Sequence, residues 1–452
     1  MHPSYMYIAC LSTLAYCKPL PSRGNDLLTE LGLPVVDTGA TAYALLYGSP
    51  LLAFYQPAKN YLEGPGTNVM GGHNSTETAT SHQVVRPNVD TVYASGTYNL
   101  SATDLIVTLP PMEDSRFYLF AFYDPFGDIF ATLGSVTASA PGEYLLRDTN
   151  EACHGTLVPV NTHKLTYPAL TLDDFASLSK STAVSALQLT ARLQSRTPPE
   201  TLFYKAAIPG ILAEAGIRDG QYKQPACVNF TLAVTLADAA VKAFTAAPSS
   251  YPNFGNGWSC LNTSYSGSFQ DSTAIIQRAI TAVDLYLGVT AVNALYPTLG
   301  STVTSLSSGE AYRLDFSGKP PVKDAGFWSV TMYDDAEHLV DNTLNTYAVG
   351  DRSNITFPNG ELVYGAGTDN DTAFQLLVQA ADVSPPGNWS ANWLPAPSGG
   401  GSFTLTCKSA TLFRFMTDGP NGDKVRLYGP TAALSDGSYV YPIVTKVKAI
   451  EA

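Results

Sequence analysis

The sequence predicts an α+β protein in which two related, mostly β units, of sandwich or jelly-roll type, are separated by a mainly helical block. The first observation is an internal match: residues 110–124 and 320–334 align without a gap, with Pro-Pro, an Asp, a Phe and a closing Tyr-Asp at the same offsets. The second is that short aromatic or β-branched runs ended by Gly or Pro surround both copies. The third is that the chain between them is rich in Ala and Leu without strand alternation.

Changes in residue composition and periodicity divide the chain into five segments. Gly48 and Pro50 interrupt an early apolar run, so two short helices that meet at a kink are expected there. The residue pattern after these helices is typical of strands. It becomes typical of helices near residue 166 and is again typical of strands near residue 301. The expected segments are 1–17 (signal peptide), 18–62 (N-terminal helical arm), 63–165 (first β-rich domain), 166–300 (helical block) and 301–452 (second β-rich domain).

Both β-rich domains should consist of short strands between Gly- and Pro-rich turns. Trp328, Val330 and Met332 alternate with Ser329 and Thr331, which is typical of a half-buried strand. A hairpin is expected within residues 134–146. The other expected strands are 104–109, 117–122, 312–316, 327–333, 374–378, 403–407 and 412–415.

Charge and the N-terminal sequence limit the partners and the compartment. The net charge of −13, with no run of Lys or Arg, argues against nucleic acid or an anionic membrane surface as a partner. Residues 6–16 form an apolar run too short to span a bilayer, followed by the small residues of a cleavage site, although no Lys or Arg precedes it. We therefore expect a secreted, extracellular protein without a membrane span; a buried N-terminal strand is the alternative.

Cysteines and glycosylation sequons fit the same compartment. Cleavage near residue 17 leaves four cysteines, an even number suited to disulfides. Cys227 and Cys260 are close in sequence and are the expected pair, which leaves Cys153 with Cys407; four buried thiols are the alternative. Sequons occur at Asn74, Asn99, Asn229, Asn262, Asn354, Asn370 and Asn388.

Residues 88–93 form the first cluster that could carry chemistry. Asn88, Asp90 and Thr91 place three short polar groups beside Tyr93 at the start of an apolar strand. Such a cluster can orient a ligand or hold a carboxylate as a general base. Alternatively, these side chains bond to backbone groups where the strand begins.

A second polar string follows the acidic turn at residues 334–337. It contains His338, Asp341, Asn342, Asn345 and Tyr347, where alternation of apolar and polar residues would be expected. Asp341 and His338 could act as an acid–base pair, but their spacing puts them on opposite faces of a strand, so a joint role requires a loop. No histidine pair has the spacing of metal ligands, so no metal-ligating residue is assigned; an oxygen-rich metal site that includes Asp341 and His338 is left open, as is the cofactor.

Aromatic residues near the C-terminal end provide a third candidate. Trp389 and Trp393 beside prolines could form a wall for a sugar or could pack under a loop. The chain contains no GxSxG, HExxH, Walker or GxGxxG signature, so the common hydrolase, metalloprotease, kinase and dinucleotide readings lack their motifs.

Several of these stretches resemble two families of unknown function. The Asn-x-Asp-Thr-x-Tyr pattern at 88–93 resembles the motif of domain of unknown function 1254. Residues 327–334, 341–342 and 392–397 look like its usual C-terminal partner, domain of unknown function 1214. The resemblance implies two mostly β units with a helical portion and no settled activity. It emphasises the polar residues of both clusters, although Thr346 stands where the family commonly has Arg.

Two functional hypotheses follow. The first is a secreted enzyme acting on a small polar or oxygenated molecule in a pocket lined by Asp, Asn and Tyr. The second is a non-catalytic secreted protein that binds carbohydrate or a cell-surface component through its tryptophans. The residues assigned to the first are Asp90 and Asp341 (acid–base catalysis) and Asn88, Thr91, Tyr93, Asn342, Asn345 and Tyr347 (substrate binding), with Trp393 as a further ligand-binding residue.

Overall fold

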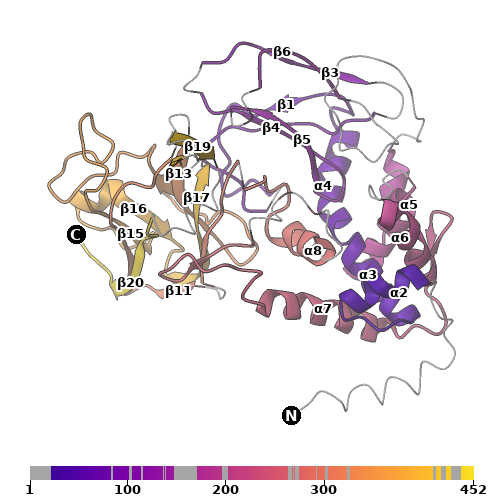
Figure 1. Ribbon diagram of the computed structural model, residues 1–452. Helices are drawn as coiled ribbons and strands as arrows, with labels where there is room; N and C mark the ends of the chain where they lie inside the picture. The colour runs from indigo at the N-terminus through magenta and orange to yellow at the C-terminus, as the bar shows by residue number, and fades with distance from the viewer. Residues whose placement is uncertain are drawn as a thin grey trace.

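The computed structural model confirms a mixed α+β protein, with most helices at the right, the first β unit along the top and the second β unit at the left in Figure 1. Its description covers residues 22–82, 85–100, 104–113, 116–135, 137, 139–146, 170–195, 202–262, 267, 269, 274–291, 293–300, 304–322, 326–410, 414–418, 424–428 and 439–452. The expected signal peptide lies outside these residues.

The helical unit is built around α3, which is buried along its whole length. Its sequence is rich in Ala and Gly, so neighbouring helices can approach closely: a Cβ added at Gly48 would lie 2.0 Å from Thr190 Oγ1. As expected, one helix ends at Gly48 and the next begins at Pro50. The helices are α2 (Ser22–Glu30), α3 (Asp37–Gly48), α4 (Pro50–Glu63), α5 (Thr182–Leu193), α6 (Leu202–Glu214), α7 (Phe230–Ala246) and α8 (Ala274–Asp284), with a 3-10 turn η1 (Leu172–Phe175).

The N-terminal arm and the central block form one helical unit. Side chains of α2, α3 and α4 share a single hydrophobic core with those of α5 to α8. The arm and the block are therefore separate in sequence only, because the first β unit lies between α4 and α5 in the chain.

The first β unit consists of three strand pairs around a small core. β1 (Gly71–Gly72) pairs with β2 (Ala94–Ser95), β3 (Leu105–Leu109) with β6 (Gly142–Leu146), and β4 (Leu119–Tyr123) with β5 (Ile129–Gly134). The hairpin expected within 134–146 is wrong, because its two ends pair with β4 and β3 instead. The small polar residues between them form a turn, in which Gly134 N donates to Ser139 Oγ at 3.1 Å.

The second β unit contains two sheets that contribute to one core. The first is ordered β14-β13-β17-β10-β9, with β11 also on β17, and the second is β16-β15-β12-β20. Phe316 stacks on Phe374 at 4.7 Å and lies 5.1 Å from Trp328, so aromatic rings from both sheets meet. The strands are β9 (Trp258–Ser259), β10 (Thr298–Leu299), β11 (Thr304–Ser307), β12 (Glu310–Phe316), β13 (Phe327–Tyr333), β14 (Ala348–Gly350), β15 (Phe374–Ala380), β16 (Trp393–Ala396), β17 (Gly400–Ala410) and β20 (Ile443–Lys448).

Strand β13 is buried on both faces, so the expectation of a half-buried strand is wrong. Trp328, Val330 and Met332 enter the core of the second unit, as their alternation predicted. Ser329 and Thr331 on the opposite face are also buried. The reason is that a segment from the first third of the chain covers this face.

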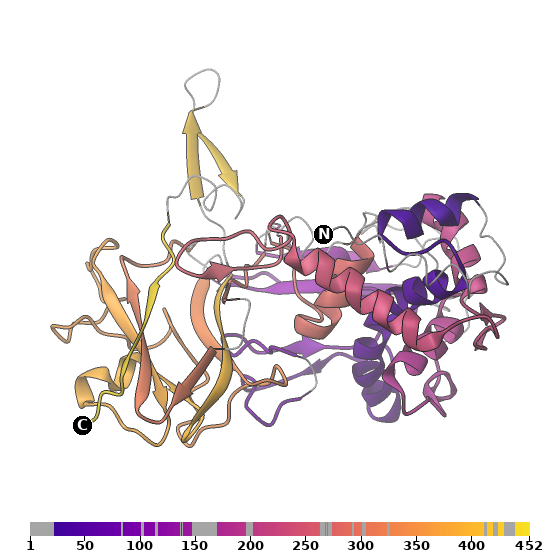
Figure 2. The same cartoon turned by 90° about the horizontal axis from the view of Figure 1, so that it is seen from below.

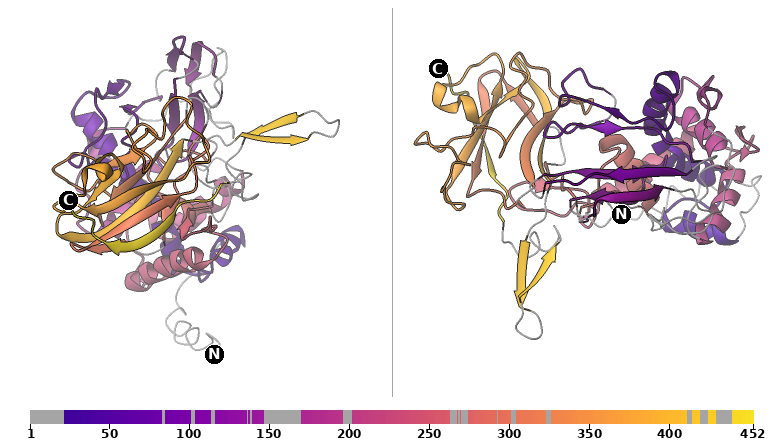
Figure 3. Two further views of the ribbon diagram at one scale, coloured as in Figure 1. Left: turned by 90° about the vertical axis from the view of Figure 1, so that its left-hand side faces the viewer. Right: turned by 90° about the horizontal axis from the view of Figure 1, so that it is seen from above.

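One hairpin leaves the body of the protein. Strands β18 (Arg414–Asp418) and β19 (Lys424–Tyr428) pair with each other in an antiparallel arrangement. Figure 2 and Figure 3 show this hairpin projecting away from the second unit.

The structure does not form the expected disulfide between Cys227 and Cys260. The Cys227 thiol donates to Asp37 Oδ2 at 2.8 Å at the start of α3, whereas Cys260 is buried next to β9, so the two residues belong to different units. Burial raises the pKa of Cys260 to about 12. Cys153 and the Cys407 side chain lie outside the described residues, so their pairing stays a prediction.

Most sequon asparagines lie on the surface. Asn74, Asn229, Asn354, Asn370 and Asn388 are exposed, and Asn99 and Asn262 are partly exposed. In the described part of the chain, no helix is both long and apolar enough to cross a membrane.

We predict that the two described cysteines are thiols with different reactivity. In the native protein at pH 8, iodoacetamide should leave Cys260 unlabelled, because it is buried and its thiolate is strongly disfavoured. Denaturation without a reductant should allow both Cys227 and Cys260 to be alkylated, as measured by peptide mass spectrometry. A cross-linked peptide containing both residues would contradict this.

Candidate functional site

The candidate site lies where residues 85–93 cross the outer face of β13. Hydrogen bonds from two residues of β13, and one from Arg352, hold the segment there. Ser329 Oγ donates to Asp90 Oδ2 at 2.7 Å, and Tyr333 Oη donates to Pro87 O at 3.0 Å. Arg352, just after β14, donates from Nη1 to Asp90 O at 2.6 Å. These bonds connect the loop beside the first β unit to the central sheet of the second.

The segment is held in shape by its own polar side chains. Asn88 N donates to Tyr93 Oη at 2.6 Å, Asn88 Nδ2 donates to Thr91 Oγ1 at 2.8 Å, and Asp90 N donates to Asn88 Oδ1 at 2.8 Å. Asn88, Thr91 and Tyr93 therefore stabilise the turn, which is the alternative that the sequence left open for such residues. The Asp90 carboxylate is different, because it points out of the turn toward Ser329.

An ion pair fixes the beginning of the segment. Arg86 Nη2 donates to Glu337 Oε1 at 2.9 Å, Arg86 Nε donates to the other oxygen, and Arg86 N donates to Glu337 O at 2.8 Å. Burial lowers the pKa of Arg86, but the bonds to Glu337 outweigh it and the net shift is upward. Both residues have left-handed backbone conformations, with φ of 46° and 63°. This strain persists only because the fork of bonds compensates for it.

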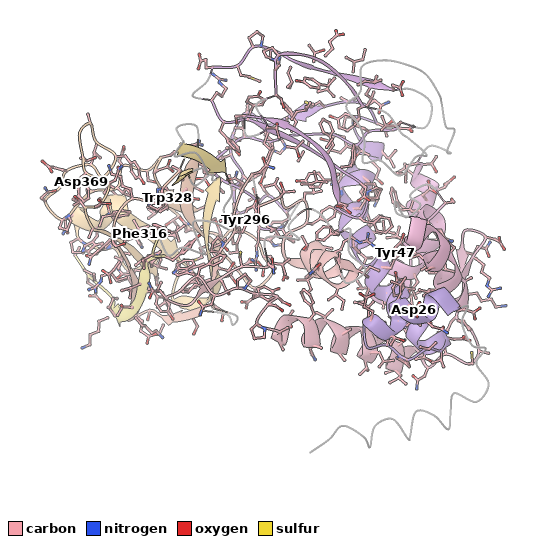
Figure 4. The ribbon with its side chains drawn as sticks, in the orientation of Figure 1. Asp26, Tyr47, Tyr296, Phe316, Trp328 and Asp369 are labelled. Carbon is pink, nitrogen blue, oxygen red and sulfur yellow. The ribbon has the colours of Figure 1, made fainter. Side chains whose placement is uncertain are left out.

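Tyrosine side chains converge behind the segment. Tyr93, Tyr123, Tyr296 and Tyr333 come from four different parts of the chain, and Figure 4 labels Tyr296 where the second β unit meets the rest of the molecule. Burial raises the pKa of Tyr93 to about 12 and the pKa values of the other three still further, and the tyrosines add to one another's shifts. All four hydroxyls therefore stay protonated at physiological pH.

A second carboxyl lies within electrostatic reach of Asp90. Burial raises the pKa of Asp351 to about 6, and the Asp90 charge adds to the shift, while the Trp328 N–H and Arg352 oppose it. Asp351 Oδ1 accepts the Trp328 N–H at 3.0 Å. Asp351 therefore titrates closer to neutrality than an exposed aspartate does.

The second polar string occupies the loop between β13 and β14. Asp341 is exposed, and no hydrogen bond or ion pair between it and Asp90 occurs among the described residues. Asn342 is buried and braces the loop, donating to Val340 O at 3.2 Å and Thr346 O at 3.1 Å. Tyr347 Oη donates to Asn345 Oδ1 at 3.0 Å. A joint acid–base role for Asp90 and Asp341 stays a prediction.

The remaining candidates lie elsewhere. Trp393 is buried in the second unit, and its indole N–H donates to Gln379 O at 3.0 Å. The His338 ring stacks on His82 at 4.2 Å. Within the part of the chain that the structure describes, no group of three or more His, Cys, Asp or Glu side chains is placed to hold a metal ion.

Sequence reasoning missed several residues of this site. Ser329 and Tyr333 belong to the aromatic strand that the internal match singled out, but neither was assigned a role in a site. Arg86 was not assigned a role either, because the proline that follows it predicts only an extended backbone. Asp351 carries no sequence signal, because its environment is created by the approach of residue 90 from far away in the chain.

Comparisons with known proteins agree with the motifs. Residues 68–172 match the family described as Protein of unknown function (DUF1254), and residues 293–410 match the family described as Protein of unknown function (DUF1214). The chain therefore carries a DUF1254 domain followed by a DUF1214 domain. The contacts of Asp90 with Ser329 and Arg352 join one domain to the other.

Similarity to individual proteins is low. The crystal structure of the VPA0106 protein from Vibrio parahaemolyticus resembles this chain with a TM-score of 0.47 and 16% identity, covering 91% of this chain and 100% of that one. No curated protein matches the sequence. The family descriptions name no activity, so a function has to be inferred from the site.

We predict that Glu337→Gln destabilises the protein. The substitution removes the charge that pairs with Arg86 and leaves a partly buried guanidinium with a weaker acceptor, so a loss of roughly 1–3 kcal/mol is expected in urea unfolding. Glu113→Gln is the matched control, because the Glu113–Arg116 pair is mostly exposed, with side chains 76% and 62% accessible. Equal losses in both variants would contradict the assigned role of Glu337.

Proposed function

We propose that the protein is an enzyme acting on a small polar or oxygenated molecule at the junction of residues 85–93 with β13. The supporting observation is the position of the Asp90 carboxylate. The turn that carries it is shaped by other side chains, while the carboxylate itself is presented to a buried strand of the other domain. A carboxylate held this way, beside buried tyrosines with shifted pKa values, is typical of a site built for chemistry.

The proposed chemistry is general acid–base catalysis. Asp90 would accept a proton from the bound molecule, with Ser329 fixing the orientation of its carboxylate. Tyr93, whose hydroxyl accepts the Asn88 N–H and stays protonated, would donate a hydrogen bond to a developing negative charge on an oxygen of the substrate. Asp351, with its pKa raised to about 6, would exchange the proton near neutral pH, so two carboxyls in different environments take different roles.

The alternative is a non-catalytic protein that binds carbohydrate or a cell-surface component. It was based on Trp389 and Trp393 as an aromatic wall. Trp393 is only 8% exposed and its N–H is bonded within the fold, which leaves Trp389 as the partly exposed member. The burial of Trp393 favours the enzyme over this alternative.

We also propose that the protein is a secreted glycoprotein and that its second β unit is a sandwich. The exposure of five sequon asparagines supports secretion, since glycans require surface positions. The single core shared by the two sheets supports the sandwich. The edge-to-face contact of Phe117 and Phe327, at equivalent positions of the internal match and 5.5 Å apart, supports a relation between the two β units.

We predict that Asp90→Asn leaves the thermal unfolding midpoint unchanged or raises it. The amide keeps an oxygen for the Ser329 hydroxyl and removes a charge that is costly beside a buried strand. Asp335→Asn, at an exposed position in the turn after β13, is the control and should also leave the midpoint unchanged. A fall of about 4 °C or more for Asp90→Asn alone would indicate a structural carboxylate and contradict the proposal.

The same variants allow a search for the substrate. Sugars, polyols and hydroxy acids would be tested for raising the midpoint of the unmodified protein, and each hit would be incubated with it and analysed by mass spectrometry. We expect at least one hit to be converted by the unmodified protein and by Asp335→Asn, with conversion reduced at least about 100-fold in Asp90→Asn. Hits that bind without conversion would instead support a binding protein.

A further inference from the structure

We propose a second ligand site, at Arg278, that binds the carboxylate group of a small organic monoacid. The site lies at the junction of α3, α8 and the turn between β4 and β5. Figure 1 shows α8 on the side of the helical unit that faces the second β unit, and Figure 4 labels Tyr47 beside it. The inference does not depend on the proposed catalytic role of Asp90.

The Arg278 guanidinium is positioned by two aromatic rings. Its Cζ lies 5.0 Å from the centre of the Tyr47 ring, on α3, and 4.5 Å from the centre of the Phe126 ring, in the β4–β5 turn. The two rings contact each other, with centroids 5.0 Å apart. A guanidinium placed against an aromatic corner is restricted in orientation, so its hydrogen-bonding edge points in one direction.

That edge has buried donors without an acceptor. Arg278 Nε and Nη2 are both inaccessible to solvent, and neither makes a hydrogen bond within the described part of the chain. These two nitrogens form the side-on edge of the guanidinium, and the spacing of their N–H groups matches the two oxygens of a carboxylate. Because an arginine stays charged even when buried, leaving this edge without an acceptor is costly. A carboxylate bound from outside the fold would supply acceptors to both donors.

The neighbouring aspartates accept hydrogen bonds from backbone N–H groups instead. Asp124 Oδ1 accepts the N–H groups of Phe126 at 2.8 Å and Asp128 at 2.9 Å, which shapes the turn. Asp128 Oδ1 accepts the Phe269 N–H at 3.2 Å. Asp124 lies within electrostatic reach of the guanidinium and of Asp128, but no bond from either carboxyl to the side-on edge of Arg278 occurs among the described residues.

The surroundings favour a singly charged ligand with an apolar body. Asp124 and Asp128 would repel a dianion such as phosphate, whereas a monocarboxylate forms the two bonds with less repulsion. The rings of Tyr47 and Phe126 offer an apolar contact for the rest of the molecule. Short-chain carboxylic acids have this chemistry.

The charge state of Asp124 should control the affinity. Burial, followed by repulsion from Asp128, raises the pKa of Asp124 to about 7, and Arg278 opposes the shift. The other titratable groups at the site are Tyr47 and Tyr286, and burial raises both of their pKa values, so they stay neutral. Below pH 7 Asp124 is protonated and an incoming carboxylate meets one negative charge fewer. Binding should therefore be tighter at pH 6 than at pH 8.

Calorimetric titration of the full chain with sodium propionate, at constant ionic strength, tests the proposal. We expect saturable binding at pH 6, at least about tenfold weaker in Arg278→Lys, because a single ammonium cannot form the fork. Arg278→Met should abolish binding. Arg313→Lys is the matched control, since its guanidinium is already bonded to Asp315 at 2.9 Å, and it should bind as the unmodified protein does. Asp124→Asn should remove the difference between pH 6 and pH 8.

Each contrary result identifies what is wrong. Absence of saturable binding at pH 6, or equal binding by Arg278→Lys and the unmodified protein, would overturn the site. Phosphate binding as tight as propionate would overturn the choice of a monocarboxylate. Asp90→Asn should bind propionate normally, so failure of this inference and failure of the proposed catalytic role can be told apart.

Discussion

The structure depends on the way residues 85–93 cover the outer face of β13. Without this cover, Ser329, Thr331 and Tyr333 would form an open polar face on one strand of an otherwise apolar unit. With it, Ser329 and Tyr333 gain partners across the boundary between the two units, and the Thr331 hydroxyl contacts that of Ser329 at 3.3 Å. Because an unpartnered buried polar group is costly, the two domains stabilise each other where the proposed chemistry takes place.

The helical unit supports the proposed sites through packing between residues that have no chemical role. Small residues along α3 let the other described α-helices approach it, and the resulting core holds α8 in place. Arg278 and Asp284 both belong to α8, the first at the proposed carboxylate site and the second close to the Arg86–Glu337 pair. One helix thus carries residues of two polar centres, and its position depends on that packing.

Sequence alone predicted the class of fold, the four longest strands of the second unit (β12, β13, β15 and β17) and the kink at Gly48–Pro50, because these depend on local periodicity and on Gly and Pro chemistry. It also singled out Asp90 as a candidate general base. It could not predict that Asn88, Thr91 and Tyr93 would satisfy one another, since that depends on the turn geometry of the segment. Nor could it find Asp351 or Arg278, whose environments arise when segments far apart in the chain meet. The pairing of Cys227 with Cys260 failed for the same reason: closeness in sequence did not become closeness in space.

The burial of both faces of β13 constrains how the protein can evolve. Trp328 and Val330 are anchored in the core, and the pleat of the strand makes them set the height and tilt of Ser329 between them. Any substitution that shifts the large side chains therefore also moves the hydroxyl that orients Asp90. Natural variation in the hydrophobic interior is thus coupled to variation in the proposed reaction centre. We expect a lineage that acquires a new specificity to alter the loops around β13 before the strand itself.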